Sequence, residues 1–244
     1  MQDDGKGFAY FWKIRTRIHF STRIAFNVGA NTMDLFDWER FSATALCRNP
    51  YDHVVVTGFV KPEAIGKINA DYPAIEHTGS FSIEGLRFGP GFQSMVKALE
   101  SERFRWAIEE KFQMSLSGRP TTITVRGHCA PGDGQVHTDS ASKLITILIY
   151  LNPSWHHGGG RLRLLRGKNI EDVTTEVDPS GGNLVAFLRS DHSWHGHLPF
   201  HGERRVIQFN WVKDKSSRRI VFLRHRLSAS IKHLLGRSKR RPQE

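Results

Sequence analysis

The chain has 244 residues, of which 39% are hydrophobic and 11% aromatic, and its formal net charge is +11. This length is sufficient for one large β-rich domain or two small ones. No apolar run approaches the roughly 18–20 residues that a membrane-spanning helix needs, and the first residues show no apolar region followed by a secretory cleavage site. Cys47 and Cys129 are too few for a disulfide framework, so we expect a reducing, cytoplasmic setting.

The positive charge is concentrated at the C-terminal end. Residues 213–244 contain eleven Lys or Arg against two acidic residues, which accounts for +9 of the total. Residues 1–212 are therefore nearly neutral. A nucleic-acid-binding body would be expected to carry its own basic surface, so this distribution argues against a nucleic-acid partner.

The first predicted elements are a strand and two helices. Residues 52–60, DHVVVTGFV, are rich in β-branched side chains and predict a strand. A short helix is predicted over 61–73, starting near Pro62. Residues 92–114, FQSMVKALESERFRWAIEEKFQM, have apolar side chains at helical spacing and form the strongest predicted helix. These segments predict a helical support over about 60–118.

From Thr121 onward, short β-branched or aromatic runs alternate with Gly and Pro turns. The runs are TTITVRG, KLITILIYLN, GRLRLL, VTTEV, NLVAFL, HSWHGHL and RRVIQFNWV. Many short strands divided by such turns indicate an antiparallel sandwich or barrel. The predicted organisation is an N-terminal extension (1–50), a single domain (51–212) with its β core at about 120–212, and a C-terminal tail (213–244).

His137 and Asp139 stand in the loop before the most apolar of these runs. In an extended chain, residues two apart point to the same face, so an imidazole and a carboxylate can contribute two ligands of a metal site. The alternative is an ordinary loop histidine beside a capping aspartate, because a match to H-x-D alone is weak.

A second polar cluster lies about 55 residues further on, in residues 189–212. A histidine from this cluster would complete two imidazoles and one carboxylate, a set that leaves open positions and suits non-haem Fe(II). An arginine on the following strand could bind an organic diacid through two parallel hydrogen bonds. The candidates are His192, His195, His197, His201, Arg204 and Arg205.

This layout resembles the Fe(II)- and 2-oxoglutarate-dependent dioxygenase superfamily, and within it the prolyl 4-hydroxylase-like branch. The resemblance covers roughly 120–212 and the strand and helix at 52–73. LITILIYLN, GGRLRLL and GGNLVAFLRS are similar to the branch's core strands. The resemblance implies a mainly β fold with supporting helices (α+β), built on a double-stranded β-helix, which is a cupin-like jelly roll.

The resemblance also implies the roles of individual residues. His137, Asp139 and His195 would bind the iron, with His197 as the main competitor for the third position. Arg205 is favoured as the residue that binds 2-oxoglutarate, because Trp211 follows it by six, while Arg204 suits the position of Gly202 better. Tyr150 would reach the same carboxylate or simply fill the core.

The implied reaction is hydroxylation of a C–H bond in a protein, small-molecule, glycan or lipid substrate. Fe(II) is the implied cofactor, 2-oxoglutarate and O₂ are cosubstrates, succinate and CO₂ are released, and ascorbate is a candidate reductant. The alternatives are a nucleic-acid demethylase of the same superfamily and a non-catalytic jelly-roll binding module with a basic tail. Residues 74–91 and 154–160 are the expected substrate-choosing loops.

The basic tail has its own pattern. In residues 216–244, apolar residues recur at roughly helical spacing among basic ones, which is typical of an amphipathic helix. Such a helix could bind an anionic membrane surface or an acidic partner, which would make the protein peripheral to a membrane. It could also dock on the domain with a solvated basic face.

Overall fold

The computed structural model describes residues 34–218. Its helices are α1 (Trp38–Ala43), α2 (Pro62–Ala70), α3 (Pro90–Leu99) and α4 (Glu102–Phe112), with a 3₁₀ helix at Ile83–Gly85. Its strands are β1 (His53–Val56), β2 (Phe81–Ser82), β3 (Thr121–Cys129), β4 (Lys143–Tyr150), β5 (Leu162–Leu165), β6 (Val173–Val177), β7 (Leu184–Leu188), β8 (His195–Gly196) and β9 (Gly202–Val212). Within this range no helix is long and apolar enough to cross a membrane.

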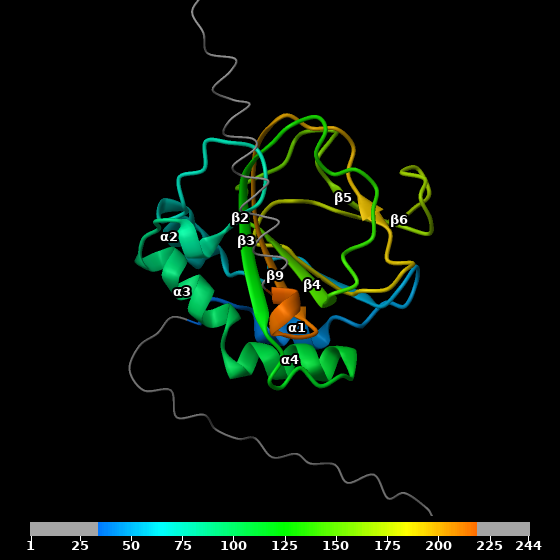
Figure 1. The fold of residues 1–244 in the computed structure, drawn as a ribbon. Coiled ribbons are helices and arrows are strands. Elements are labelled where there is room, and N and C mark those ends of the chain that lie inside the picture. The colour runs from blue at the N-terminus through cyan, green and yellow to red at the C-terminus, as the bar shows by residue number, and fades with distance from the viewer. Residues whose placement is uncertain (1–33, 219–244) are drawn as a thin grey trace, which may run out of the picture. The chain divides into compact units, whose positions relative to one another are not determined.

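The strands form two antiparallel sheets. The larger sheet has the order β1-β7-β4-β9-β3-β2, and the smaller has the order β6-β5-β8. The helices lie along one side of the larger sheet, while β5 and β6 lie on its other side (Figure 1). This arrangement confirms the predicted mainly β fold with supporting helices around a jelly-roll core.

The predicted helical support is present, but one of its helices is divided. The helix predicted from Pro62 is α2, with that proline in its first turn. The single helix predicted over 92–114 is instead α3 followed by α4. The Ser101 side chain accepts a hydrogen bond from the Phe104 backbone N–H and so caps a new helix at this point.

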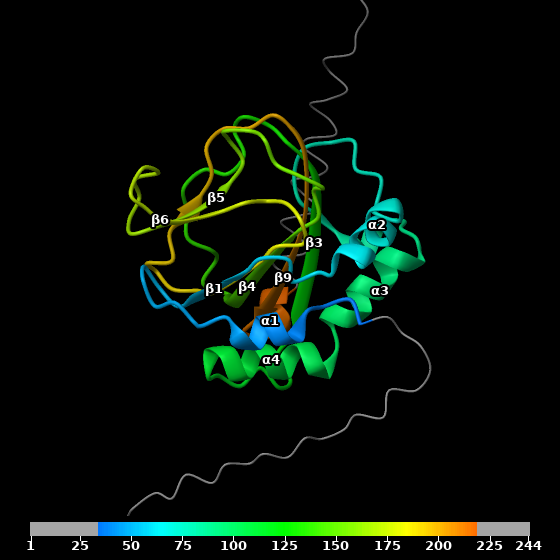
Figure 2. The same ribbon diagram turned by 180° about the vertical axis from the view of Figure 1, so that it is seen from behind.

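The main hydrophobic core lies between the helices and the larger sheet. Phe104 of α4 is fully buried, with its ring stacked on Trp211 and edge-on to Phe209 of β9. Figure 2 shows the same layering from behind. The sheet contributes the same alternate positions on each central strand: Ile123 and Val125 on β3; Ile145, Ile147 and Ile149 on β4; Ile207, Phe209 and Trp211 on β9.

The chain is already packed before residue 51. Phe36 and Phe41 are buried in the same core as Val54 and Val56, and Phe36 pairs with Val60 across an isolated bridge. Packed structure therefore extends N-terminal to the predicted domain boundary. β9 ends at Val212. The predicted amphipathic helix of the tail lies outside the described residues, except for residues 216–218, which are helical.

Candidate active site

Three predicted ligands meet at one point. His137 and Asp139 lie in the loop before β4, and His195 begins β8. The backbones of His137 and His195 exchange two hydrogen bonds of 3.0 Å each, so this bridge between the loop and β8 places the two imidazoles side by side. One ligand atom from each of His137, Asp139 and His195 lies within 4.8 Å of the others. This is the predicted set of two imidazoles and one carboxylate.

Hydrogen bonds to the backbone set the tautomers of both histidines. His137 Nδ1 lies 2.7 Å from the Gln135 carbonyl oxygen, and His195 Nδ1 lies 2.9 Å from that of Ser193. A carbonyl oxygen can only accept, so in each ring Nδ1 carries the proton and Nε2 keeps a free lone pair. Burial lowers the pKa of His195 to about 4, with the opposing effect of Asp139 too small to reverse it. At neutral pH His195 is therefore the neutral imidazole that metal binding requires.

Asp139 is a buried carboxylate held in its ionised form. Burial by itself would raise its pKa, but the charge of Lys143, the electrostatic interaction with His195 and hydrogen bonds from Lys143 and Thr146 hold the pKa well below the usual range. Lys143 Nζ lies 2.6 Å from Asp139 Oδ1, and the Thr146 hydroxyl donates to Oδ2. The carboxylate is therefore charged and fixed at both oxygens.

The three ligands open into a cavity of about 230 Å³ between the two sheets. Leu148, Leu162 and Val206 supply apolar wall, while Arg126 and Arg204 contribute charge. The volume is below the roughly 300–1,000 Å³ of typical ligand pockets, so the cavity suits a small organic molecule beside the ligand set.

The two adjacent arginines of β9 face opposite sides of the sheet. Arg204 lines the cavity and is 4% exposed. Arg205 points to the helix side, where its guanidinium pairs with Glu203 and lies 3.2 Å from the Asn69 carbonyl oxygen. The prediction that Arg205 reaches the cavity is wrong. Trp211 was the reason for favouring it, yet a residue six positions from Trp211 shares its face, and that face packs on the helices.

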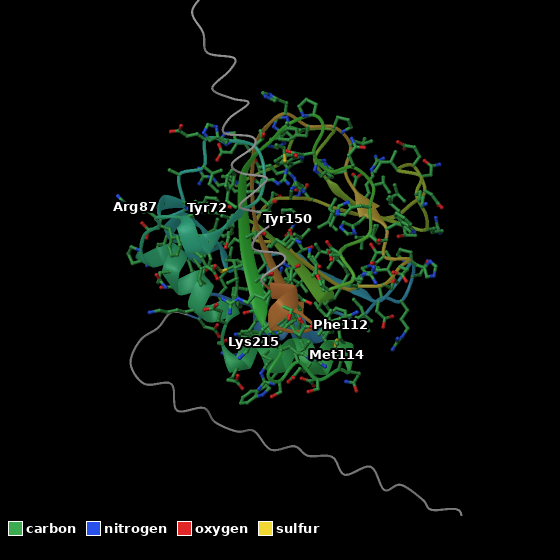
Figure 3. The ribbon with its side chains drawn as sticks, viewed as in Figure 1. Tyr72, Arg87, Phe112, Met114, Tyr150 and Lys215 are labelled. Carbon is green, nitrogen blue, oxygen red and sulfur yellow. The ribbon has the colours of Figure 1, made fainter. Side chains whose placement is uncertain are left out.

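Tyr150 lies inside the molecule and is fully buried (Figure 3). Its hydroxyl is 3.5 Å from Arg204 Nη2, and the Arg204 guanidinium carbon lies 5.2 Å from the ring centre. Burial raises the pKa of Tyr150 above its usual value, despite the opposing effect of Arg204. Tyr150 packs in the cluster between the sheets with Leu162 and Val206, so it contacts residues that line the cavity but does not itself line it.

The remaining candidate histidines differ in their burial and in whether they line the cavity. His192 and His201 are exposed. His197 is buried and lines the cavity, but within residues 34–218 the only group of metal-type ligands contains His195 and not His197. The His197 ring lies against Gly134, where a Cβ would come within 2.2 Å of Nε2. Gly134 has φ of +77°, so both its conformation and its contact favour glycine.

Sequence reasoning did not identify Lys143, Thr146 or Arg126 as site residues. Lys143 and Thr146 hold Asp139, and Arg126 pairs with Asp133 and lies 3.2 Å from Ser80 at the cavity wall. A signal for Thr146 existed, because it is a polar residue inside the otherwise apolar run LITILIYL. The position of Lys143, four residues after Asp139, was a weaker signal.

Comparison with known proteins agrees with this geometry. The family model described as "2OG-Fe(II) oxygenase superfamily" matches residues 125–213. No curated protein sequence matches the chain. Among solved structures, prolyl 4-hydroxylase from Phytophthora capsici is 20% identical, with a TM-score of 0.50 over 78% of this chain and 70% of that one. A Pseudomonas putida prolyl 4-hydroxylase is 18% identical, with a TM-score of 0.49 over 72% of this chain and 97% of that one.

The fold, the ligand set and the family match converge. Residues 125–213 match the model of the 2OG-Fe(II) oxygenase superfamily, and the matched segment includes all three ligands and Arg204. The superfamily uses Fe(II), with 2-oxoglutarate and O₂ as cosubstrates. The residues present fit that metal, because two imidazoles and one carboxylate lie together and such a set would leave positions open on Fe(II).

Proposed function

We propose that the chain is an Fe(II)- and 2-oxoglutarate-dependent dioxygenase that hydroxylates a C–H bond, of the prolyl 4-hydroxylase-like branch. One observation carries the proposal: the ligand set and a buried arginine line the same cavity. A metal site alone would fit many enzymes. A metal site with a cationic residue in the same small cavity fits an enzyme that binds an organic acid beside its metal.

Arg204 is the proposed partner of the distal carboxylate of 2-oxoglutarate. Its Nε donates to the Gly160 carbonyl oxygen at 2.8 Å, and no carboxylate lies within ion-pair distance of it among residues 34–218. A buried charge is costly unless it is paired. An incoming carboxylate would supply the missing charge, and the planar guanidinium can bind it through two hydrogen bonds.

The chain's residues would divide the work between binding and orientation. Bound Fe(II) supplies the redox chemistry that couples conversion of 2-oxoglutarate to succinate and CO₂ with oxygen insertion into a C–H bond. His137 and His195 present Nε2, and Asp139 presents a carboxylate oxygen. Arg204 would orient the cosubstrate, and the apolar walls of the cavity would exclude water.

The segment at 74–91 would contribute to substrate choice. Ser80 reaches the cavity wall from this segment, where Arg126 Nη2 lies 3.2 Å from its hydroxyl. The pair presents a hydroxyl and a guanidinium on the side of β3 that faces the cavity. Loop 154–160 would act from the other end, because Gly160 holds Arg204.

Turnover of 2-oxoglutarate tests the proposal. The protein with Fe(II) and ascorbate should convert 2-oxoglutarate to succinate, even slowly and without added substrate. His137→Ala should lose this activity, because it removes a ligand. Wild-type protein that neither binds Fe(II) nor releases succinate would contradict the proposal.

The adjacent arginines provide a matched pair for the cosubstrate. Arg204→Gln should weaken 2-oxoglutarate binding by about 2–5 kcal/mol, since it removes one side of a buried charge pair. Arg205→Gln should leave the Michaelis constant for 2-oxoglutarate within about threefold of wild type, since exposed ion pairs contribute about 0–1 kcal/mol. Equal effects of the two substitutions would exclude Arg204 as the specific partner.

A further inference from the structure

A row of polar side chains, two of them buried, crosses three strands behind the metal ligands. Thr146 of β4 is the register partner of Asn210 of β9, which is in turn the partner of Thr122 of β3. Thr146 and Asn210 are 1% and 2% exposed. Oγ1 of Thr146 lies 3.1 Å from the Asn210 side-chain amide, which lies 3.1 Å from Thr122 Oγ1. The row ends at Asp139, whose Oδ2 accepts from Thr146.

We propose that Thr146 is a positioning residue that fixes the Asp139 carboxylate for the metal, and that Asn210 fixes Thr146. The inference rests on the proposed metal site. A β-branched side chain in a strand has few rotamers, so the Thr146 hydroxyl is a rigid donor. Lys143 holds the other oxygen, Oδ1, at 2.6 Å, and the two contacts together prevent the carboxylate from turning about its Cβ–Cγ bond.

The number of protons available for hydrogen bonding determines the donor-to-acceptor direction along the row. The Thr146 hydroxyl has one proton but lies beside two acceptor oxygens, Asp139 Oδ2 and Asn210 Oδ1. The ionised carboxylate is the stronger acceptor and takes the proton. Gln208 Nε2 lies 3.3 Å from Asn210 Oδ1. Exchanging the oxygen and NH₂ of both amides lets Asn210 donate to Thr146 and to the Gln208 oxygen, and accept from Thr122. Every group in the row is then satisfied, and each donates toward the metal ligand.

The structure also explains why Thr146, rather than Lys143, is the rigid part of this arrangement. Lys143 has a long, flexible side chain that lines the cavity and is 11% exposed. Thr146 also lines the cavity but is only 1% exposed, and its strand is paired on both sides by β7 and β9. Its hydroxyl can therefore hold Asp139 at a fixed position before any metal arrives.

The test measures metal affinity directly, without turnover. Mn(II) and Co(II) serve as probes, with dissociation constants from titration calorimetry and the coordination of Co(II) followed by its visible spectrum. Thr146→Val keeps the size of the side chain and removes the donor, so Mn(II) binding should weaken by about 10–100-fold, as is typical when a residue that orients a ligand is lost. Thr146→Ser keeps the donor and should restore affinity to within about threefold of wild type.

Thr124→Val is the matched control. Thr124 lies on β3, is 3% exposed and lines the same cavity, but no hydrogen bond joins it to Asp139 among the residues described. Its valine variant should bind Mn(II) as wild type does and give an unchanged Co(II) spectrum. Equal loss in the two valine variants, or no loss in Thr146→Val, would overturn the proposal.

Two further variants distinguish a failure of the role proposed for Thr146 from a failure of the metal site itself. If Thr146→Val does not fold, Thr146→Ala also lacks the donor and adds no bulk; wild-type Mn(II) affinity in that variant would equally refute the positioning role. His137→Ala tests the site itself. Loss of Mn(II) binding in His137→Ala without loss in the donor-free Thr146 variants would leave the metal site standing and remove only the role of Thr146. Unchanged Mn(II) binding in His137→Ala would remove the metal site.

Discussion

The two faces of the larger sheet are built from the same strands but follow different rules. On the helix side, Ile147, Phe209 and their neighbours at alternate positions form one continuous apolar core. On the cavity side, Thr146, Asn210 and Arg204 place polar groups at the intervening positions. One face gains stability from burial, and the other holds charges and hydrogen bonds in defined places. Substitutions on the two faces should therefore separate stability from function.

The largest expected effect lies on the helix face. Phe104→Ala removes a fully buried ring that contacts Phe209 and Trp211. We expect a loss of about 3–5 kcal/mol in the free energy of unfolding, from lost burial and the cavity left behind. Urea unfolding measures it. The folded fraction should retain its Mn(II) affinity; a simultaneous loss of both properties would show that the two faces are coupled.

A smaller effect is expected from ligand binding at the cavity face. At a free Mn(II) concentration about 100 times the dissociation constant, binding should stabilise the protein by about 2.7 kcal/mol. For a domain of this size, that corresponds to a rise of roughly 5–10 °C in the unfolding midpoint. His195→Ala should abolish the rise because it removes a ligand, and EDTA should reverse it in the wild type. Thermal scans with and without metal test both expectations, and a rise that survives in His195→Ala would indicate a different metal site.

The sequence predicted much of this arrangement because periodicity is a local property. The spacing of His137 and Asp139 placed both on one face, and the strand runs after Thr121 predicted the antiparallel sheets. The helix division at Ser101 was missed because the apolar spacing continues across it, whereas the capping hydrogen bond depends on a single side chain.

The two arginines show where local reasoning went wrong. Side chains alternate along β9 as expected, but the cavity lies on the side of the strand opposite to Trp211. Trp211 marks the core face, whereas Gln208 and Asn210 mark the polar face, and Arg204 shares their parity. The alternation of polar and aromatic residues in QFNW (208–211) therefore indicates which side of β9 faces the cavity.

The hydrogen bond from Thr146 to Asp139 could not be predicted from the sequence in the same way. It depends on the pairing of Thr146 with Asn210, which lies 64 residues further along the chain. Local patterns do not specify which residues of two distant strands stand opposite each other. Cross-strand register is a property of the folded sheet.

The smallest expected effect is the change in the free energy of unfolding when either arginine is replaced in the ligand-free protein. Arg204→Met replaces a buried cation, which has no carboxylate partner among residues 34–218, by an apolar side chain. Because desolvation of a charge disfavours burial, the free energy of unfolding should stay within about 1 kcal/mol of wild type or rise. Arg205→Met removes an ion pair with Glu203 that is partly exposed, and should cost about 0–1 kcal/mol.

Urea midpoints without 2-oxoglutarate measure both changes, and the same series repeated with 2-oxoglutarate sharpens the comparison. Saturating 2-oxoglutarate with Mn(II) should stabilise wild type and Arg205→Met beyond the effect of the metal alone, and Arg204→Met should lose this extra stabilisation. A loss of several kcal/mol in ligand-free Arg204→Met would instead make Arg204 a structural residue. That result would contradict the inference that its missing partner is the cosubstrate, because an arginine kept for binding should contribute little to the fold until its ligand arrives.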